Sequence, residues 1–331
     1  MSYDWTKSSR VPRNGLAAWY QYEPGVSANN LINDYSGNGR HVSCGAGNAP
    51  VLTANLLAGQ PGWYFNGTRD PLQWSGSLNI RYAVVVGSFE DAAFSQYQGV
   101  VTGLTNGDVL LSNNSGTLIF FDSGSPQFDY RKNDVLYADN ARQAPVSGSH
   151  SIMEMIMPGG IPMDGVQIGK DRNFTGRLLK GWIFEVLLFT IDPTELMRRF
   201  LFEYLAMRYW LWPRVADGKA VFPFVFNKQI NREYGRETYL SEPYEGEPTG
   251  LIRGDFKSAY ELPFNLRESH ELLAAEEFFR SHQPLSKFVL RDFRHQPHRD
   301  TVVRFASPTM SEEGSNTTYR FNYSFDVIQT D

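Results

Sequence analysis

The longest unbroken apolar run of the chain lies between Gly181 and Thr190 and is rich in Ile, Val, Leu and Phe. A run without polar alternation predicts a strand that is buried on both faces. Apolar residues then recur at helical spacing and predict an amphipathic helix. Its expected inward face consists of Leu196, Met197, Phe200, Leu201, Tyr204, Leu205 and Met207.

The start and stop of this helix are also predicted. Asp192 supplies an N-cap, Pro193 a preset first-turn residue and Glu195 a capping-box acid. Arg199 and Glu203 follow Glu195 one turn apart, so we expect these three side chains to pair in water. Pro213 stops the helix. The whole stretch predicts the last strand and closing helix of a domain.

Short apolar strands separated by turn residues fill the part of the chain before this stretch. Asn106-Gly107 and the run from Asn113 to Gly116 are strong hairpin signals. Regularly spaced strands with almost no helix predict an antiparallel β-sandwich. The expected strands are Gly15–Tyr22, Trp63–Gly67, Ile80–Phe89, Gly99–Gly103, Val109–Leu111, Thr117–Phe121, His150–Met157 and Val166–Gly169.

The chain changes character after residue 212, and we place an arm at 1–13, the sandwich at 14–212, a linker at 213–220 and a second domain at 221–331. A helix is expected from Ser269 to about Ser281, with Leu272, Ala275, Phe278 and Phe279 turned inward. The expected strands are Gly254–Leu266, Phe288–Phe293, Thr301–Phe305 and Tyr319–Val327, with strand fragments and long loops over Tyr234–Ile252. The prediction is a mainly β protein: a sandwich (jelly roll) closed by one helix, then a smaller α+β domain with an antiparallel sheet and one main helix.

Composition excludes several classes of protein. The 331 residues carry a formal net charge of −5, which gives no electrostatic footprint for nucleic acid. Cys44 is the single cysteine, so we expect no disulfide framework and assembly in a reducing compartment. No apolar run approaches the ~20 residues that span a bilayer, and the N-terminus is not a signal peptide.

Two groups of residues are candidates for binding. Asp34 and Asn38 lie in an Asx-rich turn that binds calcium or, alternatively, only its own backbone; no other cofactor is expected. Trp74, Phe94, Tyr97 and Tyr130 lie in or near predicted loops, where they stack on sugar rings or belong to the core. His295 and His298 have metal-like spacing, but a polar loop is the preferred interpretation. The sequence contains none of the common catalytic motifs, so we expect no enzymatic activity.

Residues 14–212 resemble laminin-G-like, concanavalin-A-type jelly-roll domains. The resemblance rests on the GLAAWYQY strand, the turn from Asp34 to Gly39, the strand WYFNG and the closing helix pattern. Further matching positions are Phe174, Gly176, Ile183, Glu185, Val186, Leu187, Phe189, Tyr204, Leu205, Ala206 and Arg208. The same sandwich hosts lectins, adhesion modules and glycosidases, so the resemblance implies a fold and leaves the function open.

The second domain resembles minor tail proteins of long-tailed, lambda-type phages. The resemblance rests on an apolar strand, a helix reading E-x-x-x-L-x-x-F-F-[RK]-x-[HR], the strand F-x-L-R-D-F and a final alternating strand. It implies a homo-oligomeric ring, as a hexamer or trimer, between tail tube and tip (hub) proteins. We assign Tyr239, Tyr244, Phe288 and Arg291 to the ring interface.

These resemblances give the preferred hypothesis of a phage tail structural protein, assembled in the host cytoplasm, whose sandwich contacts host surface polysaccharide. A carbohydrate-binding protein with no role in a particle is the second hypothesis. The third is a glycosidase with Glu185 as its acid, which would need a second carboxylate across a groove.

Overall fold

The chain forms two compact units, Met1–Ala216 and Asp217–Asp331. The computed structural model describes residues 11–23, 27–90, 97–112, 119–120, 129–137, 149–215, 217–222, 231–241, 249–282, 286–292, 299–306, 311–315 and 320–329.

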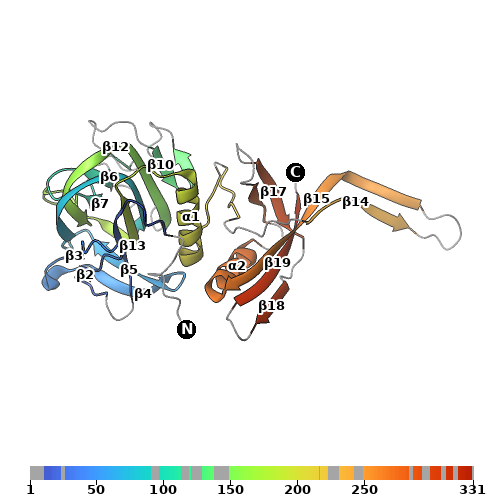
Figure 1. Cartoon of the computed structure of the whole chain (residues 1–331), viewed down its shortest axis with the longest axis horizontal. Helices are drawn as coiled ribbons and strands as arrows, with labels where there is room; N and C mark the ends of the chain where they lie inside the picture. Colours follow the sequence, from blue (N-terminus) through green and yellow to red (C-terminus); the bar gives the residue numbers. More distant parts are fainter. Residues whose placement is uncertain are drawn as a thin grey trace. The chain divides into compact units, whose positions relative to one another are not determined.

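The first unit is a β-sandwich with one long helix against it (Figure 1). Its helix α1 runs from Glu195 to Tyr209, and a short 3-10 turn covers Ala46–Asn48. Its strands are β1 Leu16–Gln21, β2 Leu31–Ile32, β3 Val42–Ser43, β4 Val51–Leu57, β5 Gln60–Asn66, β6 Leu72–Phe89, β7 Gly99–Thr102, β8 Asp108–Ser112, β9 Ile119–Phe120, β10 Asp129–Lys132, β11 Val135–Tyr137, β12 Ser151–Ile168 and β13 Lys180–Phe189.

Two long strands, β6 and β12, pass through both layers of the sandwich. Their pairing is antiparallel, and its register shifts between Ile156 and Ile161, where Pro158, Gly159 and Gly160 interrupt the ladder. One half of β6 pairs with β13 and helps to build the layer beneath α1, while β12 also pairs with β10 and, at its far end, with β7. The sequence predicted two strands where β12 is continuous, because a Pro-Gly-Gly run that normally ends a strand is accommodated here as an irregularity.

The layer beneath α1 is buried on both faces. Successive residues of β13 alternate between two apolar clusters: Val186 belongs to the cluster between the layers, and Leu187 to the cluster shared with the helix. The same alternation places Trp19 of β1 on the helix side and Tyr20 between the layers. This confirms the prediction that the strand preceding the helix is buried on both faces.

Helix α1 begins and ends at other residues than the sequence predicted. Thr194, not Asp192, is the N-cap, and its hydroxyl accepts a hydrogen bond of 3.1 Å from the Met197 backbone nitrogen. Asp192 instead forms an ion pair of 2.6 Å with Arg81. The helix ends before Pro213, at a left-handed C-cap formed by Trp210.

Five of the seven residues predicted to face inward from α1 are buried, namely Met197, Leu201, Tyr204, Leu205 and Met207, and the prediction fails at other positions of the helix. Leu196 and Phe200, predicted to face inward, are 57% and 39% exposed, whereas Arg198 and Arg208 are buried. Glu203, predicted to lie in water, is buried and accepts a 3.1 Å hydrogen bond from Arg199. The prediction was wrong because buried arginines have carboxylate partners in the sheet, which no helical hydrophobicity pattern reveals.

The second unit is an antiparallel sheet with helix α2, Ser269–Ser281. Its strand order is β14-β15-β19-β17-β16, and β18 pairs with β19. The strands are β14 Asn231–Ser241, β15 Thr249–Glu268, β16 Phe288–Asp292, β17 Arg299–Phe305, β18 Ser311–Ser315 and β19 Arg320–Gln329. The predicted inward residues of α2, namely Leu272, Ala275, Phe278 and Phe279, are all buried, and Phe278 packs edge-on against Phe288 at 5.3 Å between ring centroids.

The predicted fold class is confirmed as mainly β, a sandwich closed by one helix and followed by an α+β part. Strand β15 is longer than expected. Residues Tyr234–Ile252, predicted as strand fragments with long loops, contribute to the antiparallel pair of β14 and β15, with 242–248 outside the described residues.

Candidate functional site

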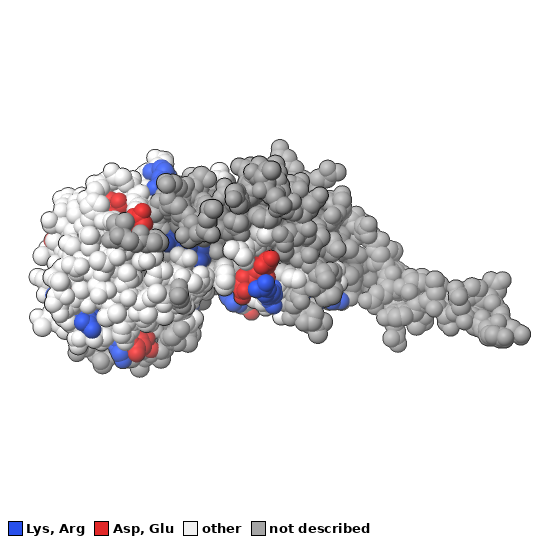
Figure 2. Space-filling model, turned by 90° about the horizontal axis from the view of Figure 1, so that it is seen from below, with Lys and Arg blue, Asp and Glu red and all other residues white. Residues whose placement is uncertain are grey.

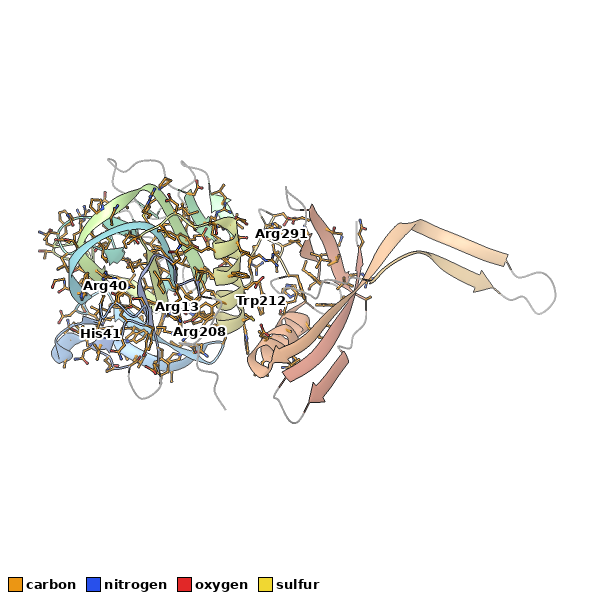
Figure 3. All side chains as sticks on the ribbon, in the orientation of Figure 1. Arg13, Arg40, His41, Arg208, Trp212 and Arg291 are labelled. Atoms are coloured by element: carbon orange, nitrogen blue, oxygen red, sulfur yellow. The ribbon has the colours of Figure 1, made fainter. Side chains whose placement is uncertain are left out.

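Glu185, the candidate glycosidase acid, is a structural residue beneath α1. It is 1% exposed, and its Oε1 accepts hydrogen bonds from Trp19 Nε1 at 2.6 Å and from the Tyr204 hydroxyl at 2.8 Å. Arg208 Nη1 lies 3.3 Å from its other oxygen, at the end of α1 where Figure 3 labels Arg208. Because this carboxylate is buried, no substrate can reach it and it does not face a groove. Glu185 instead joins its own strand β13 to α1 and to β1.

A second buried carboxylate holds the start of α1. Arg198 Nε donates to Glu154 Oε1 at 2.7 Å, and Arg198 also pairs with Asp134 at 2.6 Å. The Tyr82 hydroxyl donates a second hydrogen bond to Glu154, at Oε2. Burial raises the pKa of Glu154 although Arg198 opposes that shift, whereas Glu154 and Asp134 together raise the pKa of Arg198 against the effect of its own burial. The helix is thus fastened near both ends by arginine–glutamate pairs.

The Asp34 turn is occupied by its own backbone. Asp34 Oδ1 accepts from the backbone nitrogens of Trp19 and Ser36, and Oδ2 accepts from that of Arg40, each at 2.9 Å. The Asn38 amide donates to backbone oxygens of β1 at 2.9 and 3.0 Å. These contacts bind the turn to itself and to β1, and calcium binding by Asp34 and Asn38 stays a prediction.

A different group of residues has the character of a binding site. It is built on the loop that joins β12 to β13, which is a tight hairpin because Lys170 bridges to Leu178 and the Asp171 backbone nitrogen donates to Arg177 O at 2.9 Å. Gly99 of β7 lies so close behind the loop that a Cβ there would overlap the backbone of Lys170 and Asp171. The loop therefore has a fixed position against the sandwich.

Asp171 organises the cations of this loop. Its side chain is fully buried, and its two oxygens accept hydrogen bonds from Arg172 Nε at 2.8 Å and Arg177 Nη1 at 2.7 Å. Arg172 has a left-handed backbone, with φ 45°, and its nitrogen donates to Thr102 Oγ1 at 3.1 Å. Gln167 further ties the loop through a 2.8 Å hydrogen bond to Arg172 O.

Phe174 is the exposed ring at the tip of the loop. It is 41% exposed, and the guanidinium carbons of Arg172 and Arg177 lie 5.0 and 4.1 Å from its centroid. Arg177 also lies 4.4 Å from the ring of Tyr97, so its guanidinium is placed between two aromatic side chains. Such contacts contribute ~0.5–1 kcal/mol each at exposed sites, enough to hold the ring in one orientation. We call Tyr97, Asp171, Arg172, Phe174 and Arg177 the loop cluster.

The residues predicted to contact glycan do not come together. Tyr97 belongs to the loop cluster. Trp74 is half-buried with Arg40 5.4 Å from its ring centroid, and Tyr130 is a buried residue of β10. Phe94 lies outside the described residues.

Two of the four residues assigned to a ring interface, Phe288 and Arg291, have described side chains, and both lie on β16. Phe288 is fully buried in the second unit, and Arg291 pairs with Asp300 at 2.8 and 2.9 Å; Figure 3 labels Arg291. Phe288 fills the core, so it has no surface to offer to a neighbouring subunit in this conformation. The side chain of Tyr239 and all of Tyr244, His295 and His298 lie outside what the structure describes.

Sequence reasoning missed the loop cluster apart from Tyr97. Phe174 was a position of the jelly-roll resemblance and not a candidate site residue. The available signal was the segment KDRNFTGR between two long strands, where an aromatic residue stands between arginines in a turn that contains Gly176. Only the structure shows that Asp171 is buried and joins both arginines.

Other kinds of site find no support in the described residues. Within those ranges, no three His, Cys, Asp or Glu side chains are grouped so that they could hold a metal ion. Neither α1 nor α2, the helices that are described, has the length and apolar character to cross a membrane. On the described surface shown in Figure 2, charged side chains are scattered and do not gather into a basic patch.

No protein-family model matches the sequence, and no curated protein matches it significantly. Solved structures similar to the chain include Trypanosoma rangeli sialidase with the inhibitor DANA, at 11% identity and a TM-score of 0.36, and the same sialidase with 2,3-difluoro-KDN, at 13% and 0.33. They cover 58% and 59% of this chain, which spans 33% of the sialidase chain in each case.

Sialidases are enzymes, and these matches contradict our prediction that the chain has no enzymatic activity, so that prediction is withdrawn. Neither sialidase is a phage tail protein. At these values the similarity assigns no reaction, substrate or residue to the chain.

Proposed function

We propose that the first unit binds carbohydrate at the loop cluster and that the second unit holds it in an oligomeric assembly of the phage-tail type. The observation that carries the binding part is the exposed Phe174 ring beside two guanidinium groups that a fully buried Asp171 orients. The assembly part is supported by the resemblance of residues 221–331 to minor tail proteins.

The chemistry of the loop cluster suits a sugar. An exposed aromatic ring offers a flat apolar surface to the C–H face of a pyranose, and adjacent N–H donors can bind its hydroxyls. A ring on a tightly bonded loop loses little conformational entropy on binding, so even a small contact area is used efficiently. The cluster is small, and we expect weak binding per site.

Weak sites become useful when they are repeated. Several sandwiches displayed on one oligomer would bind a polysaccharide together, and linked sites raise the apparent affinity by roughly 10²–10⁴ without any new contact. This is the physical reason for combining a glycan-binding unit with an assembling unit in one chain. The second unit's order of strand, helix and strands, from β15 through α2 to β19, agrees with the order in the tail-protein resemblance.

A glycan array probed with the full chain tests the binding part, with Phe174→Ala beside the wild type. Binding that Phe174→Ala abolishes supports the proposal, and an array without any bound glycan refutes it. The assembly part is tested by the molar mass of the purified full chain from light scattering. A mass of three or six chains is expected, and a monomer at all concentrations would contradict the assembly.

A carbohydrate-binding protein outside any particle is the second candidate, because the loop cluster lies wholly within the first unit. Array binding combined with a monomeric mass would favour it.

A further inference from the structure

We infer that the loop cluster selects an acidic sugar, a pyranose that carries a carboxylate, and that Arg177 is the residue that recognises the acid. The inference rests on the proposed carbohydrate binding and goes beyond it, since it names the class of ligand and the specificity-determining group.

The two arginines of the cluster differ in their surroundings. Arg172 lies between two carboxylates, with Nε 2.8 Å from Asp171 and Nη1 3.8 Å from Asp108. Among the described residues, the Arg177 guanidinium makes one hydrogen bond, from Nη1 to Asp171 Oδ2. The positive charge of Arg172 is therefore offset within the protein to a greater extent than that of Arg177.

Arg177 retains donors suited to an oxyanion. A guanidinium carries five N–H groups in a planar fork, and one hydrogen bond leaves an edge that can bind a carboxylate through two parallel bonds. The side chain is 28% exposed, so it is fixed by the protein yet open to solvent. Asp171 below it and the rings of Tyr97 and Phe174 beside it restrict its rotation.

The exposed ring and the guanidinium lie side by side at a useful spacing. The guanidinium carbon of Arg177 is 4.1 Å from the Phe174 centroid. A carboxylate bound at the edge of this guanidinium would therefore lie no farther from the aromatic face than the width of one sugar ring. A pyranose resting on Phe174 can thus present a carboxylate carbon attached to its ring to Arg177. A neutral sugar would make the same stacking contact without the charge-assisted hydrogen bonds.

The test is calorimetric titration of the full chain with two ligands, an oligosaccharide that contains glucuronic acid and the same oligosaccharide after reduction of its carboxyl groups. We expect the acidic form to bind about tenfold more tightly, as charge-assisted hydrogen bonds to one carboxylate provide. We expect this ratio to fall towards one between about 0.05 and 0.5 M salt, because a half-exposed charge is screened.

Variants assign the effect to its residue. Arg177→Gln should remove the preference and leave binding of the reduced form within about twofold, whereas Phe174→Ala should weaken both forms by about tenfold. Arg280→Gln, at an exposed arginine of α2, is the matched control and should change neither value. Tryptophan fluorescence melting checks that each variant is folded; should Arg177→Gln be unfolded, the salt dependence and Arg177→Lys, which keeps charge but loses the fork, take its place.

The outcomes separate the two proposals. Equal binding of both oligosaccharides, or a preference that persists in Arg177→Gln, overturns the acidic-sugar inference and leaves carbohydrate binding intact. If neither oligosaccharide binds and the glycan array is also empty, carbohydrate binding itself is refuted.

Discussion

Replacing Glu185 by alanine should destabilise the first unit severely. The change leaves the guanidinium of Arg208, which is 2% exposed, without its carboxylate, and it removes the acceptor of Trp19 Nε1 and one of the two acceptors near the Tyr204 hydroxyl, the other being Gln21 Oε1. Removing one partner of a buried ion pair costs ~3–5 kcal/mol, and each orphaned buried donor adds to the loss, so we expect about 4 kcal/mol or more. That is a large part of the ~5–15 kcal/mol that stabilises a typical domain.

Urea unfolding of the full chain followed by tryptophan fluorescence measures this effect. All seven tryptophans precede Pro213, so the signal reports the first unit alone. With a slope of ~2 kcal/mol per molar urea, the midpoint should fall by about 2 M. The matched control is Glu195→Gln, since the side chain of Glu195 is 56% exposed and pairs with Arg198 at the surface; we expect it to cost under ~1 kcal/mol.

A double replacement separates the ion pair from general disruption. Glu185→Leu combined with Arg208→Met removes both charges. Removing one partner of a buried pair costs ~3–5 kcal/mol because the other charge stays buried, so we expect the double replacement to cost several kcal/mol less than the sum of the two single replacements. Additive costs, or a cost under ~1 kcal/mol for Glu185→Ala, would refute the claim that this network fastens α1 to the sheet.

Three further changes test the local physics by the same fluorescence assay. Thr194→Ala should cost ~1 kcal/mol because it removes the N-cap of α1, and an unchanged midpoint would contradict that role. Gly99→Ala should destabilise the unit and also weaken glycan binding, because its Cβ would push the backbone of Asp171; intact binding would show that the loop tolerates displacement. Burial lowers the pKa of His150 from 6.5, so the neutral imidazole stabilises the fold above that pH and this contribution is lost as the pH falls below it. His150→Gln should therefore lose less stability than the wild type between about pH 7 and 5. Parallel curves of stability against pH for the variant and the wild type would refute this.

The fold could be predicted where periodicity and turn chemistry carry the information. The both-face burial of β13 follows from its uninterrupted apolar run, and the inward residues of α2 follow from helical spacing. The helix over Ser269–Ser281 also has its predicted bounds. In these elements no long-range contact had to be known.

The errors arise where distant residues decide the outcome. Leu196 and Phe200 are exposed because Arg198 and Arg208, which look like surface residues, are buried against Glu154 and Glu185. The sequence contains all four charged partners but not the strand pairing that brings them together. The hydrophobic pattern therefore predicts most of the buried face of α1, including Leu201 and Leu205, but not the buried charged residues at its margins.

The same limitation applies to the candidate site. Trp74 and Tyr130 were selected as aromatic residues near turns, and the structure places one half-buried beside Arg40 and the other in the core. Phe174 could be found only from its exposed fraction and from the buried carboxylate that orients its neighbours. Three-dimensional closeness, and not residue type, distinguishes this loop from other turns.

The most direct test of carbohydrate binding at the loop cluster is hydrogen–deuterium exchange of the full chain with and without a saturating glycan chosen from the array. We predict slower exchange in peptides that cover residues 167–179 and 97–102, with the rest of the first unit unchanged. Protection centred on Trp74 or confined to the second unit, with the 167–179 loop unaffected, would contradict it.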